Sequence, residues 1–315
     1  MIRIDINAQH VEGAADLWYD GLQKKAGTYW GKMDTKIEAE YNLGKLKNEK
    51  RQYRLCKLVL NHYKKHFKDY VLAKEDFLKR NSSVIRALAY KYPLAKEILK
   101  DMFVSVYNDF CKQQTAYEVM KKLRVNVCPY CNRQFTFTVD NSKKTRPEFD
   151  HFYDKASYPL LALSFYNLVP SCHTCNHLKR NDEAAINPYF HGFEHKFRVM
   201  SKDAHFKGDV MTLKTSELEL KLNNANAEEL KNMKTFGLNA LYNQHIDYVE
   251  SVLDRVKSYN LSAQQSLVDS FQGAGNSPQD VSDFVWRPYL EVVQNNWPLT
   301  KLTEDLLHQF GIIKK

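Results

Sequence analysis

The fold of the central part of this chain is decided by two short runs of sequence, Cys128-Pro129-Tyr130-Cys131 and Cys172-His173-Thr174-Cys175. Each run places two residues between its cysteines, so both sulfurs of a tight turn can face one metal ion. Four thiolates together complete the tetrahedral shell that zinc prefers. Because 40 residues separate the pairs, a folded insert is expected between them. The spacing therefore predicts a structural zinc site.

A redox dithiol is the alternative interpretation of such cysteine pairs. Neither pair opens a helix that follows a strand in a repeating βα pattern, which is the usual setting of a redox motif. The other two cysteines, Cys56 and Cys111, stand alone in helix-like segments. Free cysteine is among the most buried residue types, so both are expected in the core.

The composition suits one large domain or two to three smaller ones, since the chain has 315 residues. With 43% hydrophobic and 26% charged residues, it can bury a core. Its 46 Lys and Arg against 37 Asp and Glu give a formal charge of +9. Such a chain attracts polyanions, because phosphates neutralised by Lys or Arg release counterions. Basicity alone does not separate nucleic-acid binding from mere solubility.

The sequence carries no signal for export or membrane insertion. Its first ten residues hold no basic region followed by an apolar stretch, and no run of about 18 apolar residues occurs. We therefore expect a cytoplasmic protein that contacts no membrane and keeps its thiols reduced. The chain also lacks a Gly-rich loop ending in Gly-Lys-Ser/Thr, so it is not itself a P-loop ATPase.

Residues 1–122 are expected to form a helical region. From Lys45 to Phe77 apolar residues recur at steps of three and four, and a second helical stretch, 83–122, is interrupted at Pro93. Basic residues fill the gaps of the first stretch: Arg51, Arg54, Lys57, Lys64, Lys65 and Lys68. They suit a solvated helix face or a surface that follows phosphates, and the sequence leaves both open.

The pattern changes at Val125, where a strand-rich part is expected to begin. Residues 134–140 alternate with the period of a strand, and 141–145 are turn-like. The segment 146–152 is expected to return as the partner strand, completing a hairpin.

The last part of the chain is expected to be mainly helical. After Pro188 it is polar and irregular to about residue 216, and a long helix is then expected at about 227–258. A loop is indicated at 272–278, and a last helix at about 299–310 should stop at Gly311.

The insert between the cysteine pairs contains a second set of polar residues. Asp150 and His151 are adjacent, Asn167 follows within the insert, and Asn176 comes directly after the last cysteine. A single His or Asn is most often structural, but this combined spacing is much less easily accidental.

These motifs together resemble the zinc-stabilised HNH endonucleases, also called His-Me finger or ββα-metal nucleases. The resemblance covers about 55 of the 315 residues, from the first cysteine pair through Phe149-Asp150-His151-Phe152 to the run 166–179. It implies a hairpin followed by a helix, with a divalent ion held between them. The fold expected for the chain is mainly α, with helical regions at 1–122 and 191–315 flanking an HNH module at 123–190.

The resemblance also implies a role for each residue of the set. His151 would be the general base that activates water, which suits an imidazole with a pKa near 6.5. Asp150 and Asn176 would hold a catalytic Mg²⁺ or Mn²⁺ through oxygen atoms. Asn167 would tie the loop to the strand and orient His151. The four cysteines would bind structural Zn²⁺ and clamp the hairpin to the helix.

Some positions remain open at this stage. Many members of the family carry His where this chain has Asn176, and His177 lies next to it, although adjacent helical residues point about 100° apart. We favour Asn176. His173 is expected to face solvent. Lys179 and Arg180 suit either a phosphate contact or a solvated helix end.

A second, weaker resemblance concerns residues outside the motif set. The runs 158–167, 241–245 and 298–307 are similar to bacterial HNH proteins encoded beside an ATPase in anti-phage systems such as Septu and some retrons. This similarity implies a nuclease effector of antiviral defence that works with a separate ATPase partner.

The leading hypothesis is thus an endonuclease that hydrolyses phosphodiester bonds, with DNA as the expected substrate. One such site cuts one strand at a time, so a double-strand break would need a homodimer or a second engagement. The alternative is a non-catalytic zinc module that binds nucleic acid, which has no need of the Asp150, His151, Asn167 and Asn176 set. A third hypothesis, an interaction protein with a decayed site, is disfavoured because no site position is missing.

Overall fold

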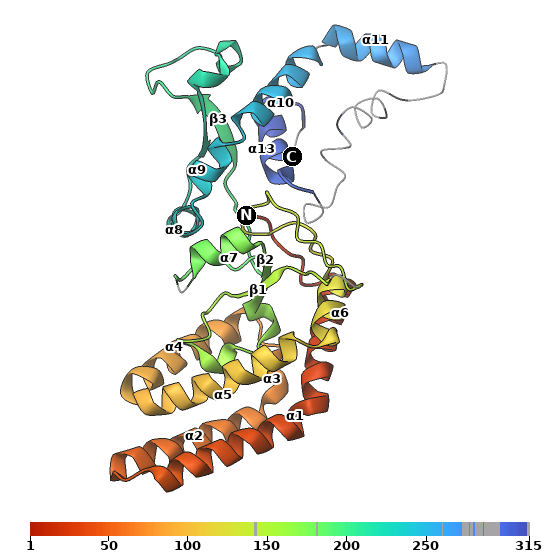
Figure 1. The fold of residues 1–315 in the computed structure, drawn as a ribbon. Coiled ribbons are helices and arrows are strands. Elements are labelled where there is room, and N and C mark those ends of the chain that lie inside the picture. The colour runs from red at the N-terminus through yellow and green to blue at the C-terminus, as the bar shows by residue number, and fades with distance from the viewer. Residues whose placement is uncertain are drawn as a thin grey trace. The chain divides into compact units, whose positions relative to one another are not determined.

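The computed structural model describes residues 1–141, 144–180, 182–259, 261–272, 277, 280, 286 and 297–313, and these are mainly helical (Figure 1). This confirms the expected mainly α fold. Two small antiparallel sheets accompany the helices. One pairs β1 (Glu148–His151) with β2 (Leu168–Ser171), and the other pairs β3 (Phe197–Ser201) with β4 (Leu218–Leu222).

The chain separates into two compact units, each built from segments distant in sequence. We call Ile4–Val125 with Thr136–Glu183 the N-terminal unit, and Met1–Arg3 with Asn126–Phe135 and Ala184–Lys315 the C-terminal unit. The division into consecutive segments at 1–122, 123–190 and 191–315 is not tested by this grouping and stays a prediction.

The N-terminal unit consists of helices and the sheet β1–β2. Its helices are α1 (Gln9–Leu43), α2 (Lys47–Lys65), α3 (Phe67–Val71), α4 (Glu75–Lys91), α5 (Pro93–Cys111), α6 (Gln114–Leu123) and α7 (His173–Lys179), with 3-10 turns η1 (Pro159–Leu161) and η2 (Phe165–Asn167). Pro93 does not merely interrupt a helix: it begins α5, where its missing N–H costs no hydrogen bond.

Trp18 of α1 links the helices to the sheet region. Its side chain is fully buried, and its indole N–H donates to the carbonyl oxygen of Leu163 at 2.9 Å. Its ring packs edge-on against Phe110 of α5 and Phe149 of β1, with centroid distances of 4.7 and 5.4 Å. The core of this unit therefore lies directly behind β1.

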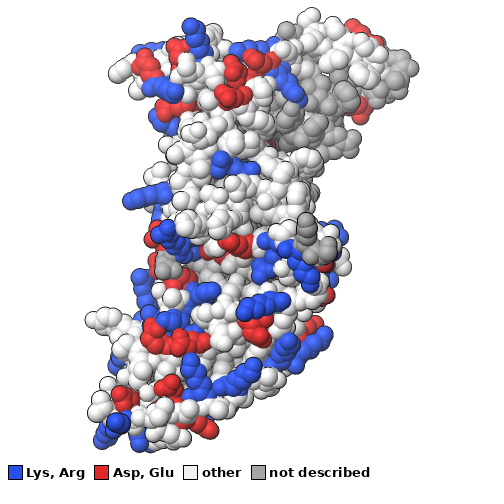
Figure 2. All heavy atoms as spheres, in the orientation of Figure 1, with Lys and Arg blue, Asp and Glu red and all other residues white. Residues whose placement is uncertain are grey.

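The basic residues of α2 lie on its outer face. Of the apolar positions in the predicted periodicity, Tyr53 and Tyr63 are buried as expected, whereas Leu46 and Leu58 are 63 and 67% exposed. Lys57 and Lys64 pair with Glu38 and Asp34 of α1, which runs beside α2. Figure 2 shows Lys and Arg interspersed with Asp and Glu on the face drawn, not an unbroken basic patch. Phosphate binding by α2 stays a prediction.

The hairpin expected at 134–152 is wrong. Within 134–140 the described chain makes only isolated bridges, Val127 with Phe135 and Val139 with Thr145. The partner of β1 is instead β2, with His151 opposite Leu168. The physical reason is burial: Phe135, Phe137 and Val139 are 46, 52 and 37% exposed, whereas every residue of β2 is buried. Alternation of apolar and polar residues does not by itself stabilise a strand whose apolar side chains are not buried against a core.

The C-terminal unit contains β3 and β4, the 3-10 turns η3 (Val210–Thr212) and η4 (Thr215–Glu217), and further helices. These helices are α8 (Ala227–Thr235), α9 (Leu238–Asn243), α10 (Ile246–Ser258), α11 (Leu261–Gln272) and α13 (Thr300–Gln309). The last of them, followed by Gly311 with φ of 70°, confirms the helix expected at about 299–310.

Two expectations for this unit are wrong. The long helix at 227–258 is three helices, because Gly237 adopts a left-handed conformation with φ of 59° between α8 and α9, and α10 begins anew at Ile246. The segment expected to be irregular contains β3, where buried Phe197 and Val199 alternate with exposed neighbours. The loop expected at 272–278 falls largely outside the described residues. No helix in the described part of the chain is both long and apolar enough to cross a membrane.

Candidate functional site

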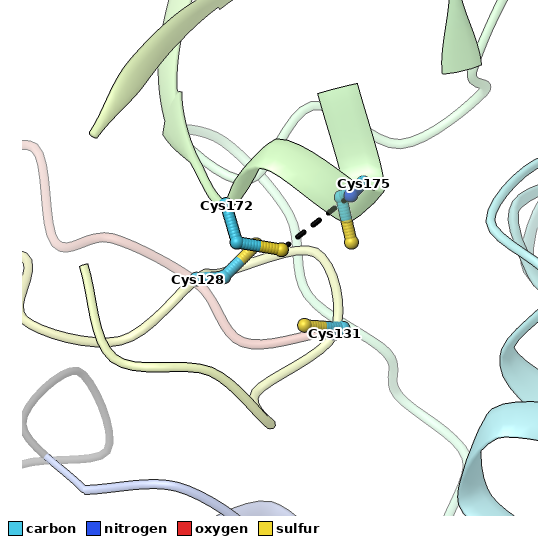
Figure 3. Close-up of side chains that lie close together, drawn as sticks. All are labelled: Cys128, Cys131, Cys172 and Cys175. Carbon is cyan, nitrogen blue, oxygen red and sulfur yellow. Dashed lines mark hydrogen bonds between the residues drawn. The ribbon is translucent and has the colours of Figure 1, made fainter. Parts of the chain in front are cut away.

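Four buried cysteines form the first part of the candidate site: Cys128, Cys131, Cys172 and Cys175. Their sulfur atoms lie within 4.8 Å of one another and converge on a common space (Figure 3). A tetrahedral shell with bonds of about 2.3 Å needs sulfur separations of about 3.8 Å, so small movements would complete it. None of these cysteines is in a disulfide. The predicted clustering is confirmed, and the set could hold a metal ion such as zinc.

Local backbone hydrogen bonds shape both cysteine turns. In the first, the amide of Asn132 donates to the carbonyl oxygen of Cys128 at 2.7 Å, and Asn132 takes a left-handed φ of 48°. In the second, Cys172 caps α7, because its sulfur accepts the amide N–H of Cys175 at 3.4 Å.

The two isolated cysteines are core residues, as predicted. Both are buried in the N-terminal unit. Burial raises the pKa of Cys56 to about 12, and its thiol lies 3.6 Å from the carbonyl oxygen of Ala95. Burial also raises the pKa of Cys111. Thiols held neutral in this way are poor metal ligands at neutral pH.

The second part of the candidate site is a pocket beside β1 and α7. These elements, with β2, form an antiparallel pair followed by a helix. The pocket has a volume of about 350 Å³. Its lining brings together three of the four residues that the sequence singled out, Asp150, His151 and Asn176. Its other lining residues are Glu148, Phe149, Asp154, Lys155, His173, His177 and Arg180.

Lys179 anchors α7 to β1 from beneath this pocket. Its side chain is 0% exposed, and its ammonium contacts Oδ1 of Asp150 at 3.1 Å and the carbonyl oxygen of His151 at 2.7 Å. Both expectations for Lys179, a phosphate contact and a solvated helix end, are therefore wrong. A buried ammonium needs a carboxylate and a further acceptor, and β1 supplies both. Arg180 is exposed and donates to His177 at 3.2 Å.

His151 is buried and neutral. Its Nε2 lies 3.1 Å from the carbonyl oxygen of Ala162. Because a carbonyl oxygen only accepts, Nε2 must carry the proton, and Nδ1 of the neutral ring keeps its lone pair. Burial, followed by the charge of Lys155, lowers the pKa of His151 from 6.5 to about 3. The ring also meets the Tyr107 ring edge-on, with centroids 4.4 Å apart.

Asn167 does not line the pocket. It forms hydrogen bonds with the segment that follows β1. It is fully buried, and its amide accepts from the N–H of Tyr153 at 2.8 Å and donates to the carbonyl oxygens of Tyr153 and Leu161. Its own carbonyl oxygen accepts from the amide of Phe152, the residue after His151, at 2.8 Å. These bonds tie the segment after β1 to the residue that precedes β2. Orientation of His151 by Asn167 stays a prediction.

Glu148 is a pocket residue that the sequence analysis missed. Its carboxylate accepts from Nδ2 of Asn176 at 2.6 Å, and its second oxygen lies 2.9 Å from Nδ1 of His173. Partial burial raises the pKa of Glu148, but hydrogen bonds to His173 and Asn176 lower it more, so the net shift is downward. The signal was available: side chains two residues apart on a strand share a face, which places Glu148 beside Asp150.

The helix residues differ in what they offer the pocket. Asn176 is half-buried and uses Nδ2 toward Glu148, which leaves Oδ1 to accept or to bind a cation. His177 is exposed. His173 is 81% exposed, as expected, although it also contacts Glu148. Among the described residues, the four cysteines form the one cluster of His, Cys, Asp or Glu close enough to hold a metal by themselves.

Comparisons with known proteins assign no family. The chain matches no protein-family model, and comparisons with curated proteins and with solved structures give no match. What the pocket does must therefore be argued from its own residues and from the motifs that it contains.

We expect Lys179→Met to destabilise the protein by about 3–5 kcal/mol, because it leaves the buried Asp150 carboxylate without its ammonium. Adding Asp150→Asn to Lys179→Met should recover part of this loss. Lys221→Met removes an exposed lysine paired with Glu219 and should cost less than about 1 kcal/mol. Urea unfolding followed by circular dichroism measures all three. An equal effect of Lys179→Met and Lys221→Met would contradict the assignment.

Proposed function

We propose that this chain is a metal-dependent nuclease of the HNH type that hydrolyses phosphodiester bonds in nucleic acid, with DNA as the expected substrate. The observation that carries the proposal is the pocket in which Asp150, His151 and Asn176 meet, built on two antiparallel strands followed by a helix. These residue types suit one base and one oxygen-bound divalent ion.

His151 supports the role of general base. A general base must offer an unprotonated nitrogen to the water that it activates. The bond from Nε2 to Ala162 fixes the tautomer, so Nδ1 is the atom that would take a proton from water. Contact with Tyr107 further restricts the ring. The protein thus holds the imidazole in one orientation and one protonation state.

A Mg²⁺ or Mn²⁺ ion fits the donor atoms at this pocket. Hard divalent ions prefer oxygen ligands, and the pocket offers the carboxylate of Asp150 and Oδ1 of Asn176, with Glu148 beside them. The Lys179 ammonium contacts Oδ1 of Asp150 at 3.1 Å and so holds this carboxylate in place. When bound, the ion would stabilise the negative charge that develops on the phosphate and the leaving oxygen.

We further propose that the four-cysteine cluster binds zinc in a structural role. Four cysteine ligands would fill every position of a tetrahedral zinc shell and leave none open to water. This is typical of structural zinc sites. The antiviral role and the ATPase partner rest on the weaker resemblance alone and are proposals of lower rank. The non-catalytic alternative predicts binding without cleavage.

Replacing His151 should abolish cleavage. Loss of a general base costs about 10²–10⁴ in rate, so His151→Ala should cut plasmid DNA at least 100-fold more slowly in Mg²⁺ or Mn²⁺. The matched control is His205→Ala, which removes an exposed histidine in the C-terminal unit. Gel assays of initial rate, with zinc content as a check on folding, make the measurement. Equal rates for His151→Ala and wild type would refute the proposal.

The third site position can be separated from its neighbour by paired substitutions. Asn176→Ala should raise the Mg²⁺ concentration needed for half-maximal cleavage, because an oxygen ligand is lost. His177→Ala should leave that concentration unchanged, since His177 contacts Arg180. Metal titrations of the cleavage rate distinguish the two. An inactive His177→Ala with a fully active Asn176→Ala would move the ligand to residue 177.

The zinc proposal predicts one tightly bound zinc per chain after purification without added metal. Cys172→Ser should lose that zinc and lower the unfolding midpoint, because metal-binding energy contributes to folding energy. Cys56→Ser changes a core thiol outside the cluster and should retain the zinc. Elemental analysis by mass spectrometry decides, and folded wild-type protein free of zinc would contradict the prediction.

A further inference from the structure

A hollow on the N-terminal unit adjoins the candidate pocket. It has a volume of about 710 Å³ and lies along α5, with Lys36 of α1 on one side and Lys155 and Ala156 on the other. Four lysines line it against two aspartates. Lys155 lines both this hollow and the pocket of His151. The two depressions therefore share a wall, and we call the hollow the lysine groove.

The carboxylates of the lysine groove do not neutralise all of its lysines. Lys36 lies 3.4 Å from Asp101, and Lys100 is paired with Glu97 on α5 itself. Asp109 accepts hydrogen bonds from Tyr29 and from Gln113 instead of pairing with a lysine.

Lys112 and Lys155 are the two groove lysines without a carboxylate partner among the described residues. Lys112 is exposed at the end of α5. Lys155 is half-buried, and its ammonium lies over the Tyr107 ring, 4.7 Å from the centroid. The same ring also meets the His151 ring edge-on. One aromatic ring thus separates an uncompensated cation from the candidate base.

Burial of Lys155 without a counter-ion is unfavourable in the free protein. Burial lowers its pKa, and the Cys111 thiol offsets this only in part. An anion brought to this point would regain the lost solvation and would meet a donor already held in place. The arrangement favours an anionic ligand that reaches from the pocket into the groove.

We propose that the lysine groove binds the phosphodiester backbone of the nucleic-acid strand, with Lys155 contacting a phosphate next to the one in the pocket and Lys112 a phosphate farther along. This inference rests on the proposed function, because it takes the pocket as the place of cleavage. A polyanion with regularly spaced charges matches separate cations better than a single small anion does. The groove then sets the direction in which the strand leaves the site.

Binding without cleavage tests the proposal. Fluorescence anisotropy of labelled 20-nucleotide DNA and RNA strands is measured with the full chain in buffer freed of Mg²⁺ and Mn²⁺. Lys112→Glu and Lys155→Glu should each weaken binding about tenfold, and each should reduce the salt dependence of the binding constant by about 0.7 in log–log slope, as expected for one phosphate contact on a single strand. Lys155→Gln removes the charge without reversing it and should show a smaller loss with unchanged zinc content.

The matched control is Lys231→Glu, an exposed lysine of α8 in the C-terminal unit, which should bind as wild type does. Groove-dependent binding of DNA or of RNA supports the proposal, and comparison of the DNA and RNA strands identifies the preferred nucleic acid. Unchanged binding by both groove variants, or an equal loss in Lys231→Glu, overturns it. Cleavage in Mg²⁺ is measured in parallel. Intact cleavage with groove-independent binding refutes the groove alone, whereas groove-dependent binding without cleavage refutes the proposed function alone.

Discussion

The buried ammonium of Lys179 is the contact on which the candidate pocket depends. It joins a side chain and a backbone carbonyl of β1 to the end of α7, and these two groups are its hydrogen-bond partners among the described residues. A buried charge is tolerated only when its partners are fixed, so this contact sets how far α7 can move from the strand. The positions of Asp150 and Asn176, one on each element, follow from it. The contact that holds the elements together also fixes the position of the carboxylate proposed to bind the ion.

The helices of the N-terminal unit also supply side chains that contact β1 and His151. Trp18 and Phe110 pack behind β1, while Tyr107 of α5 contacts the His151 ring and donates a long hydrogen bond of 3.4 Å to the carbonyl oxygen of Phe149. The same α5 carries Lys100 along the lysine groove. The helix α5 therefore contributes both to the surroundings of His151 and to the lining of the lysine groove, where the nucleic-acid strand is proposed to bind. This gives the helical region a physical connection to the pocket that a motif of some 50 residues would not need.

The spacing of residues along the chain was enough to predict the cysteine cluster, the polar residues of the pocket and several helices. Two residues between cysteines allow both sulfurs to face one ion, and the structure brings all four together. Because Asp150 and His151 are adjacent, their side chains must leave a strand on opposite faces. Asn176 directly follows the second cysteine pair, which places it on the helix that this pair begins. The helical periodicity of α2 and the end of α13 shortly before Gly311 could likewise be predicted, because helix periodicity and termination are short-range properties.

Only the tertiary structure decided which strand pairs with β1, what Lys179 contacts and where Glu148 and Lys155 lie. The alternation at 134–140 predicted the wrong hairpin, because strand pairing depends on which face finds a core and not on alternation itself. Lys179 looked like a helix-end lysine, and its burial follows from a carboxylate 29 residues earlier in the chain. Lys155 became notable only when α5 was placed beside it. The sequence by itself determined the donor types and their local spacing, while long-range packing decided which charges are paired, buried or left to face a ligand, because desolvation depends on every neighbour in space.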